Sequence, residues 1–194
     1  MLVPESVIDT LFMNARTANG FTETPVPDDL LKRAYEIACM GPTSMNTQPA
    51  RFVFIRTAEQ KERLIPALLP GNVDKTRAAP VTAIVANDAR FYEHLATTWH
   101  LPDAAKMFES NESLSAATAS RNGTLTGGYF LLACRALGLD CGPMSGFDPS
   151  KVNAEFFPDG RFQTNFLINI GYADKTKEFP RNRRLSFEEA CQLV

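Results

Sequence analysis

Residues 112–137, ESLSAATASRNGTLTGGYFLLACRAL, form the longest stretch of the chain that is compatible with a single helix. Its second half, from Tyr129 onward, is nearly apolar around the whole circumference that a helix would have. Gly123, Gly127 and Gly128 interrupt the pattern, but glycines on an internal helix permit close packing of another backbone or ring. The sequence therefore predicts a long, central and buried helix here.

Short apolar runs on both sides of this stretch predict strands. They are rich in aromatic and β-branched residues, and they read RFVFIR (51–56), PVTAIVAND (80–88) and TNFLINIGYAD (164–174). The first two enclose a helical pattern at 58–69, which is the spacing of a βαβ unit. Mixed helices and strands without a repeat or long linker indicate one α+β domain over residues 1–194, a sheet flanked by helices.

Further helices are predicted where apolar residues recur at helical spacing. The first ends near Ala15, and the second begins at Asp28 or Asp29, either of which can cap its free amides. The predicted helical segments are SVIDTLFMNA (6–15), VPDDLLKRAYEIACM (26–40), AEQKERLIPALL (58–69), PSKVNAEFF (149–157) and SFEEACQLV (186–194).

Composition narrows the class of protein. Hydrophobic residues make up 44% and charged residues 22%, which is the composition of a soluble globular protein. The formal net charge is -2 and no long run of basic residues occurs, so the sequence does not predict nucleic-acid binding. No apolar run approaches the roughly 20 residues that span a bilayer, and we expect no membrane partner. The N-terminus does not resemble a signal peptide, and we expect a cytoplasmic protein.

Side chains for covalent or metal chemistry are scarce. The sequence lacks HExxH, GxSxG, GxGxxG and GxxxxGK[ST] motifs, and we predict no metal site. His94 and His100 lie beside aromatic residues, where packed or surface roles are more common than acid–base chemistry. We expect the four cysteines to be reduced and mostly structural, and Cys141, in a glycine-rich loop, is the one candidate for a reactive thiol.

Four polar segments stand out as candidate binding loops. The segment GPTSMNTQPARF (41–52) carries hydroxyls and amides between two prolines, which suits a polyhydroxyl chain or the edge of a heteroaromatic ring, although a polar surface turn would look the same. Arg16 and Arg184 could each bind a phosphate through two parallel hydrogen bonds, and Thr17 adds a hydroxyl. Together with NARTANGF (14–21), GNVDKT (71–76) and GPMSGFD (142–148), the loops predict a phosphorylated ligand with a ring.

These segments, in this order, resemble the nitroreductase family of FMN-dependent oxidoreductases. The resemblance rests on ART (15–17), GPTSMNTQPARFVFI (41–55), GNxxK (71–75) ahead of APVTAIVA (79–86), ALGLDCGPMSGFD (136–148), NFLINIGY (165–172) and RRLSF (183–187). It implies an α+β fold with a mostly antiparallel sheet, in an interlaced homodimer with one FMN in each of two clefts lined by both chains. The long helix at 112–137 would then be an element of the dimer.

The resemblance also implies which residues bind FMN. Arg16, Thr17 and Arg184 take the phosphate positions, and Asn72 with Lys75 takes the pyrimidine edge of the ring. The ribityl chain and ring of the partner's FMN would be reached by Pro42, Thr43, Ser44, Asn46 and Gln48, and flavin N5 would lie beside the backbone of Pro143, Met144, Ser145 and Gly146. The chain departs from the family pattern at Asn19, where many members carry a basic residue, and at Ser145, where relatives often carry an acidic one.

Within the family, MGPTSMNTQPARFVF (40–54), RALGLDCGPMSGFD (135–148) and LSFEEACQL (185–193) are most similar to the malonic semialdehyde reductases of pyrimidine catabolism. This implies ping-pong transfer of hydride from NADH or NADPH through flavin N5 to malonic semialdehyde, giving 3-hydroxypropionate without a catalytic side chain. The sequence does not choose between the two nicotinamide donors. A general nitro- or quinone reductase, or a flavin-binding protein without turnover, remains an alternative.

Overall fold

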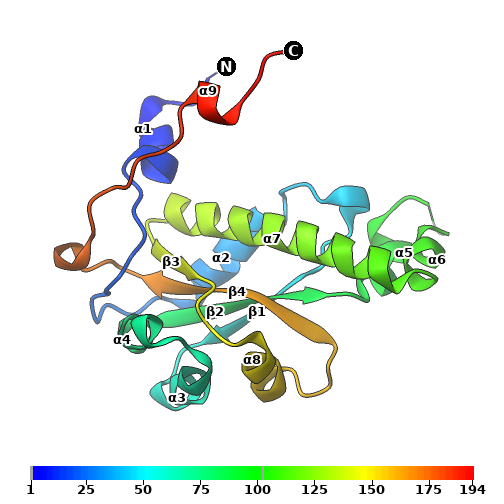
Figure 1. Ribbon diagram of the computed structural model, residues 1–194, viewed down its shortest axis with the longest axis horizontal. Coiled ribbons are helices and arrows are strands. Elements are labelled where there is room, and N and C mark those ends of the chain that lie inside the picture. The colour runs from blue at the N-terminus through cyan, green and yellow to red at the C-terminus, as the bar shows by residue number, and fades with distance from the viewer. Residues whose placement is uncertain (1, 102) are drawn as a thin grey trace.

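Four strands form one antiparallel sheet in the order β1-β2-β4-β3 in the computed structural model, which describes residues 2–101 and 103–194 (Figure 1). The two central strands, β2 and β4, are joined over their whole length, with one irregularity between Val85 and Ala86. The strands are β1 (Ala50–Ile55), β2 (Val81–Asp88), β3 (Asp140–Met144) and β4 (Phe162–Gly171). The chain therefore has the predicted α+β fold with an antiparallel sheet.

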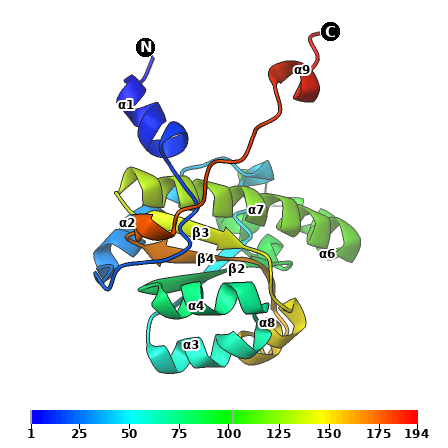
Figure 2. The ribbon, with the colours of Figure 1, turned by 60° about the vertical axis from the view of Figure 1, so that its left-hand side comes forward.

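Helices cover both faces of this sheet (Figures 1 and 2). One face carries α2 and α7, and the other carries α3, α4 and α8. The α-helices are α1 (Glu5–Ile8), α2 (Asp28–Ala38), α3 (Ala58–Leu64), α4 (Pro70–Ala78), α5 (Leu95–Thr98), α6 (Ala104–Glu109), α7 (Glu112–Ala136), α8 (Pro149–Phe156) and α9 (Phe187–Ala190). Short helices of other types are η1 (Asp9–Met13), η2 (Ser44–Asn46), η3 (Ile65–Ala67), η4 (Phe91–His94) and η5 (Lys175–Lys177).

Alternate side chains of β2 point to opposite faces of the sheet, and both sets are buried, as expected for a central strand. Val81, Ala83 and Val85 pack toward α2 and α7, whereas Ile84 and Ala86 pack toward α3 and α8. All five are completely buried. A strand buried on both faces contributes to two apolar layers at once, and this is why the run 80–88 is almost continuously hydrophobic.

Glycines set the approach of α7 to the sheet. A Cβ on Gly127 would lie 2.5 Å from the Phe166 ring, and one on Gly123 would lie 1.9 Å from Asn87 Oδ1. This confirms the prediction of close packing at these two glycines. The helix is not buried all round, however, because Leu114 and Leu125 on its other face are 37% and 42% exposed.

Three predicted features of the chain path are wrong. The helices between β1 and β2 do not make a βαβ unit, since these two strands are antiparallel neighbours. Residues 71–76 are part of helix α4 rather than a loop, and the first half of GPMSGFD belongs to strand β3. Pro143 fits a strand here because β3 lies at the edge of the sheet.

Helix ends also differ from the prediction. The first helical segment ends at Met13 rather than near Ala15, and neither Asp28 nor Asp29 caps the second helix, since both lie inside its first turn. There they still interact favourably with the helix dipole. The last helix is a single turn, which begins with a capping box between Ser186 and Glu189.

Both ends of the chain project from the same side of the molecule (Figures 1 and 2). They expose large apolar side chains, with Leu2 97%, Phe179 70%, Leu185 64% and Leu193 89% exposed. Within residues 2–101 and 103–194, no helix has both the length and the apolar character that a bilayer crossing needs.

Candidate functional site

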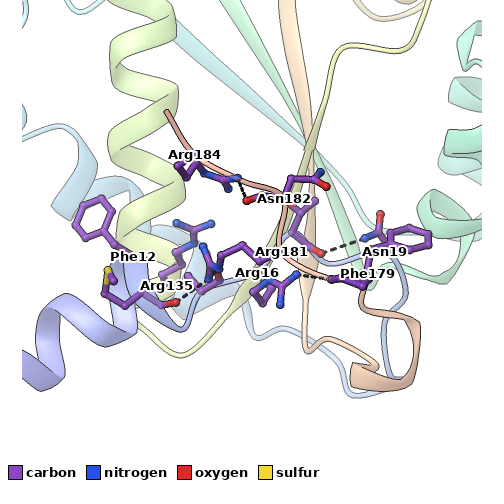
Figure 3. A pocket seen from close by; sticks show the side chains of 12 residues that line it. Phe12, Arg16, Asn19, Arg135, Phe179, Arg181, Asn182 and Arg184 are labelled. Atoms are coloured by element: carbon purple, nitrogen blue, oxygen red, sulfur yellow. Dashed lines mark hydrogen bonds between the residues drawn. The ribbon is translucent and has the colours of Figure 1, made fainter. Parts of the chain in front are cut away.

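Four arginines converge on a cavity of about 510 Å³ where the two ends of the chain meet the C-terminal end of α7 (Figure 3). We call this cavity the arginine pocket. Arg16 follows the first helical segment, Arg135 lies in the last turn of α7, and Arg181 and Arg184 come from the extended segment before α9. The other lining residues are Phe12, Met13, Ala15, Thr17, Asn19, Phe179, Pro180 and Asn182.

Backbone carbonyls hold these guanidinium groups in place. Arg181 Nη2 donates to Met13 O at 2.6 Å and to Ala15 O at 2.9 Å, so it joins the C-terminal segment to the N-terminal one. Arg135 Nη1 donates to the carbonyl of Leu11, also at 2.9 Å. Arg16 donates to Phe179 O, and Arg184 donates to Asn182 O at 2.9 Å.

No direct ion pair neutralises the arginines of the pocket, since none of the four pairs with an acidic side chain among the residues that the structure describes. Burial lowers the pKa of Arg135, although the nearby acidic groups of Cys141 and Asp140 act in the opposite direction. Guanidinium groups that cluster without direct ion pairs are suited to a phosphate, which accepts several charge-assisted hydrogen bonds.

Strand β3 connects the arginine pocket to the rest of the candidate site. Thr17 forms an isolated bridge with Cys141, and Ala18 N donates to Cys141 O at 3.0 Å. Gly142 permits this contact, because a Cβ there would lie 2.5 Å from Ala18 O. Asn19 Nδ2 donates to Thr17 O at 3.2 Å, which fixes the segment after the first helix.

The other end of β3 meets helix α4, and we call this contact the β3–α4 junction. Asn72 Nδ2 donates to Gly146 O at 2.7 Å, and Leu69 N donates to the same carbonyl at 3.0 Å. A Cβ on Gly146 would lie 2.5 Å from Asn72 Nδ2, so only glycine lets the two segments approach this closely. The junction thus brings together Asn72, which the resemblance assigns to the pyrimidine edge of the ring, and Gly146, which it assigns to flavin N5.

Lys75 lies one turn after Asn72 on the same helix. Its side chain is half-buried, it forms no ion pair with any described residue, and burial lowers its pKa. Strand β3, which runs from the residue paired with Thr17 of the arginine pocket toward the junction, has five residues and spans roughly 16 Å. A ligand with a phosphate at one end and a polar ring at the other could therefore contact both regions.

A buried polar network holds α4 in place, and no pattern in the sequence predicted it. Thr82 Oγ1 donates to Asn169 Oδ1 at 2.7 Å, and Asn169 Nδ2 donates to Thr76 Oγ1 at 3.1 Å. All three side chains are completely buried. Because each polar group has a partner, the network fixes the rotation of α4 and with it the side on which Asn72 and Lys75 lie.

The loop 42–48 lies apart from the arginine pocket. Its residues line no part of that pocket, and Thr47 and Gln48 instead border a separate cavity beside β1. Met45, Asn46 and Gln48 have φ angles of 51°, 50° and 41°, a left-handed conformation that costs on the order of 1–2 kcal/mol per non-glycine residue. Asn46 Nδ2 donates to Thr98 O at 2.8 Å.

The structure thus separates the predicted residues into three groups. Arg16, Thr17, Asn19 and Arg184 meet in the arginine pocket. Asn72 meets the segment Pro143–Gly146 at the junction, with Lys75 one turn further along α4. Pro42, Thr43, Ser44, Asn46 and Gln48 form the separate loop. Arg135 and Arg181 were missed as individual residues, although the cluster RNRR (181–184) was a visible signal.

Of the thiols and imidazoles, His94 lines the cavity that Thr47 and Gln48 border. Cys141 is completely buried within β3 rather than in a loop, and hydrogen bonding to Cys141 together with burial raises the pKa of Cys134 far above its usual range. His94 and His100 are exposed. Residues 2–101 and 103–194 contain no group of three or more His, Cys, Asp or Glu side chains arranged to hold a metal ion.

Known proteins share both the sequence and the fold. The profile of the Nitroreductase family matches residues 13–172. A protein of Ralstonia nicotianae with the provisional name NADH dehydrogenase/NAD(P)H nitroreductase is 50% identical over 189 residues, which cover 97% of each chain.

Two solved structures have the same architecture. A provisional nitroreductase of Bacillus subtilis superposes with a TM-score of 0.88 at 23% identity, over 98% of this chain and 100% of that one. A provisional nitroreductase of Exiguobacterium sibiricum, crystallised in complex with FMN, superposes with a TM-score of 0.85 at 19% identity, over 100% of this chain and 98% of that one.

The topology, the matching family profile and the relative at 50% identity together define the class of this protein. The chain belongs to the nitroreductase family.

Proposed function

We propose that residues 1–194 form one FMN-binding domain of an NAD(P)H-dependent oxidoreductase that works as a homodimer. The observation that carries this proposal is the arginine pocket, in which four guanidinium groups lack any acidic partner among the described residues. Membership of the nitroreductase family and the NAD(P)H nitroreductase name of the relative from Ralstonia nicotianae support it.

The residues present fit FMN in charge and shape. Arg16, Thr17 and Arg184 would hold the phosphate, and Arg135 and Arg181 supply further charge in the same pocket. At the other end of β3, Asn72 packs against Gly146, and the two segments that would contact the ring lie close together. Asn19, at the rim of the pocket, is uncharged, so the local positive charge comes from the arginines.

When bound, FMN supplies an acceptor and donor of hydride at its N5 atom. The chain would bind and orient the ring. Lys75 would place a positive charge at the pyrimidine edge, where negative charge increases on reduction, and Asn72 would supply an amide there. The backbone of Pro143, Met144, Ser145 and Gly146 would lie beside N5, with Met144 contributing only main-chain atoms because its side chain is buried.

A second copy of the chain would complete the site. The loop residues Pro42, Thr43, Ser44, Asn46 and Gln48 lie away from the arginine pocket of their own chain, and both chain ends expose large apolar side chains. Such ends are suited to burial against a partner, and the loop would then reach the partner's FMN. Size-exclusion chromatography with light scattering tests this arrangement, since a stable monomer that binds FMN fully would contradict it.

As the second substrate we propose malonic semialdehyde, which would be reduced to 3-hydroxypropionate after the nicotinamide product has left. The support is the similarity of residues 40–54, 135–148 and 185–193 to the malonic semialdehyde reductases. Steady-state assays should compare this aldehyde with nitroaromatic compounds and quinones, using NADH and NADPH in turn. A kcat/KM for the aldehyde below those for the quinones would favour a general nitro- or quinone reductase.

The flavin itself is tested by absorbance. We expect the purified protein to be yellow, to bleach rapidly on addition of NADH or NADPH, and to recover its colour when an electron acceptor is added. A yellow protein that NADH and NADPH do not bleach would be a flavin-binding protein without turnover. A colourless protein that does not bind added FMN would contradict the proposed function as a whole.

A further inference from the structure

Two side chains of α7 hold the loop 41–48 in its strained shape. Asn122 Oδ1 accepts a hydrogen bond from Ser44 N at 2.8 Å, and Tyr129 Oη donates to Pro42 O at 3.1 Å. The Tyr129 ring also lies against Gly41, where a Cβ would be 2.1 Å from the ring. The loop is therefore bound to the helix at both its beginning and its middle.

The spacing of the two side chains makes them a matched pair. They are seven residues apart on a regular helix, so they lie on nearly the same face, about 10 Å apart along the axis. Asn122 is itself fixed, because its Nδ2 donates to Thr118 O at 2.9 Å, and its side chain is only 4% exposed. A buried amide with both ends engaged has a single orientation.

The conformation that this pair maintains is unfavourable for the loop alone. Left-handed φ angles at Met45, Asn46 and Gln48 require support from outside the loop. Bonds within the loop, from Asn46 N to Thr43 O at 3.0 Å and from Gln48 N to Thr43 Oγ1 at 3.2 Å, close the turn but do not connect it to the body of the protein. Thr47 Oγ1 is buried without a hydrogen-bond partner among the described residues.

We propose that Asn122 and Tyr129 are positioning residues that keep the loop 42–48 in the shape that binds FMN. This inference rests on the proposed function, since it assigns the loop's shape to ligand binding. The same helix contributes Arg135 to the arginine pocket, so one rigid element positions binding groups in both regions. Neither positioning residue needs to touch the ligand.

The test uses the variants Asn122→Ala and Tyr129→Phe in the full-length protein. FMN dissociation constants are measured by quenching of flavin fluorescence, and hydrogen exchange of the Ser44 amide is measured by NMR. We expect Asn122→Ala to weaken FMN binding by about tenfold and Tyr129→Phe by a few-fold, as for the loss of one hydrogen bond each. The Ser44 amide should exchange faster in Asn122→Ala.

Asn153→Ala is the matched control, because Asn153 also accepts a hydrogen bond from a distant backbone amide, that of Thr164 at 2.8 Å, on the far face of the sheet. It should lower the midpoint of thermal unfolding without changing FMN affinity. If Asn122→Ala and Tyr129→Phe also lower the midpoint of thermal unfolding without changing FMN affinity, the two residues are only structural and the proposal is overturned. If the wild-type protein binds no FMN, the proposed function fails first, so the two failures are distinguishable.

Discussion

The arginine pocket and the β3–α4 junction lie at the two ends of one strand, yet different forces organise them. The pocket is built from arginines on the segments near both chain ends and from Arg135 of α7, and backbone carbonyls accept hydrogen bonds from them. The junction is built from a glycine, an asparagine and a buried helix face in close contact. One region depends on charge, and the other depends on shape.

This difference determines how each region should respond to change. Charge attracts a ligand over a distance but is screened by salt, with a Debye length of about 8 Å at physiological ionic strength. Close packing is insensitive to salt but tolerates almost no added volume. Substitutions that remove charge should therefore weaken ligand binding, while substitutions that add atoms should reduce stability of the fold.

The largest expected effect is on the charged side of this comparison. Replacing Arg16 with Ala removes a guanidinium group that forms no ion pair within the described residues, and it should weaken FMN binding by roughly 1.5–3 kcal/mol, about 10- to 150-fold. Fluorescence titration at low and high salt checks this, and the wild-type affinity should itself fall as salt increases.

Arg33→Ala provides the control for charge, because Arg33 is exposed on α2 and pairs with Glu36 at 2.9 Å. It should leave FMN affinity unchanged. If Arg16→Ala and Arg33→Ala had equal effects, or if FMN affinity did not change with salt, the arginine pocket would not bind FMN through its charge.

The next effect tests the shape-dependent side. Gly142→Ala would place a Cβ 2.5 Å from the backbone oxygen of Ala18, which cannot rotate away as a side chain could. We expect a loss of about 1–3 kcal/mol in the free energy of unfolding, as for other overpacked sites. Urea denaturation followed by circular dichroism measures it.

Gly71→Ala is the corresponding control, since no atom lies within 4 Å of a Cβ at that position on α4. Its stability should remain at or slightly above the wild-type value, because alanine favours helix. A Gly142→Ala protein as stable as Gly71→Ala would show that the contact between β3 and the N-terminal segment is loose.

A smaller effect is expected when a hydrogen bond at the junction is removed. In Asn72→Ala the Gly146 carbonyl keeps its bond from Leu69 N, so the carbonyl is not left unpaired. The free energy of unfolding should fall by about 0.5–1.5 kcal/mol. Asp74→Ala, at an exposed position of the same helix, should change it less; a larger loss there would mean that the helix itself, rather than the junction, is fragile.

The two regions also differ in how far the sequence predicted them. Arg16 and Arg184, which line one pocket, could be predicted to lie together because charge and motif are visible in the residues themselves. Helix α4 was missed because PGNVDKTRA contains proline, glycine and asparagine, which favour turns. Tertiary contacts stabilise it instead, including the bond from Asn169 to Thr76.

Strand β3 was missed for a related reason. DCGPM has the composition of a loop, and its strand conformation depends on pairing with β4, with Pro143 opposite Ile168. Pairing between residues far apart in the sequence leaves no local pattern. The apolar strands β1, β2 and β4, in contrast, were predicted because their hydrophobic runs are continuous.

The smallest predicted effect concerns a charge placed inside the shape-dependent region. Burial lowers the pKa of Lys75, so its ammonium group holds a proton less tightly in the folded protein than in the unfolded chain, where the pKa of a lysine is about 10.4. Between the pKa of Lys75 in the folded protein and its higher pKa in the unfolded chain, the free energy of unfolding therefore increases with pH. Below the folded-state pKa this contribution to stability is absent. Lys61 acts in the same direction, since burial lowers its pKa as well.

Lys75→Gln should remove part of this alkaline rise in the protein without FMN and slightly increase stability at neutral pH, as urea denaturation at several pH values would measure. Lys151→Gln, at an exposed position of α8, should leave the rise intact. Lys75→Gln should also weaken FMN binding. The charge of Lys75 costs stability in the free protein, but we propose that the same charge interacts with the pyrimidine edge of the flavin ring. If Lys75→Gln neither stabilises the free protein nor weakens FMN binding, Lys75 is an ordinary surface lysine, and the junction depends on shape alone.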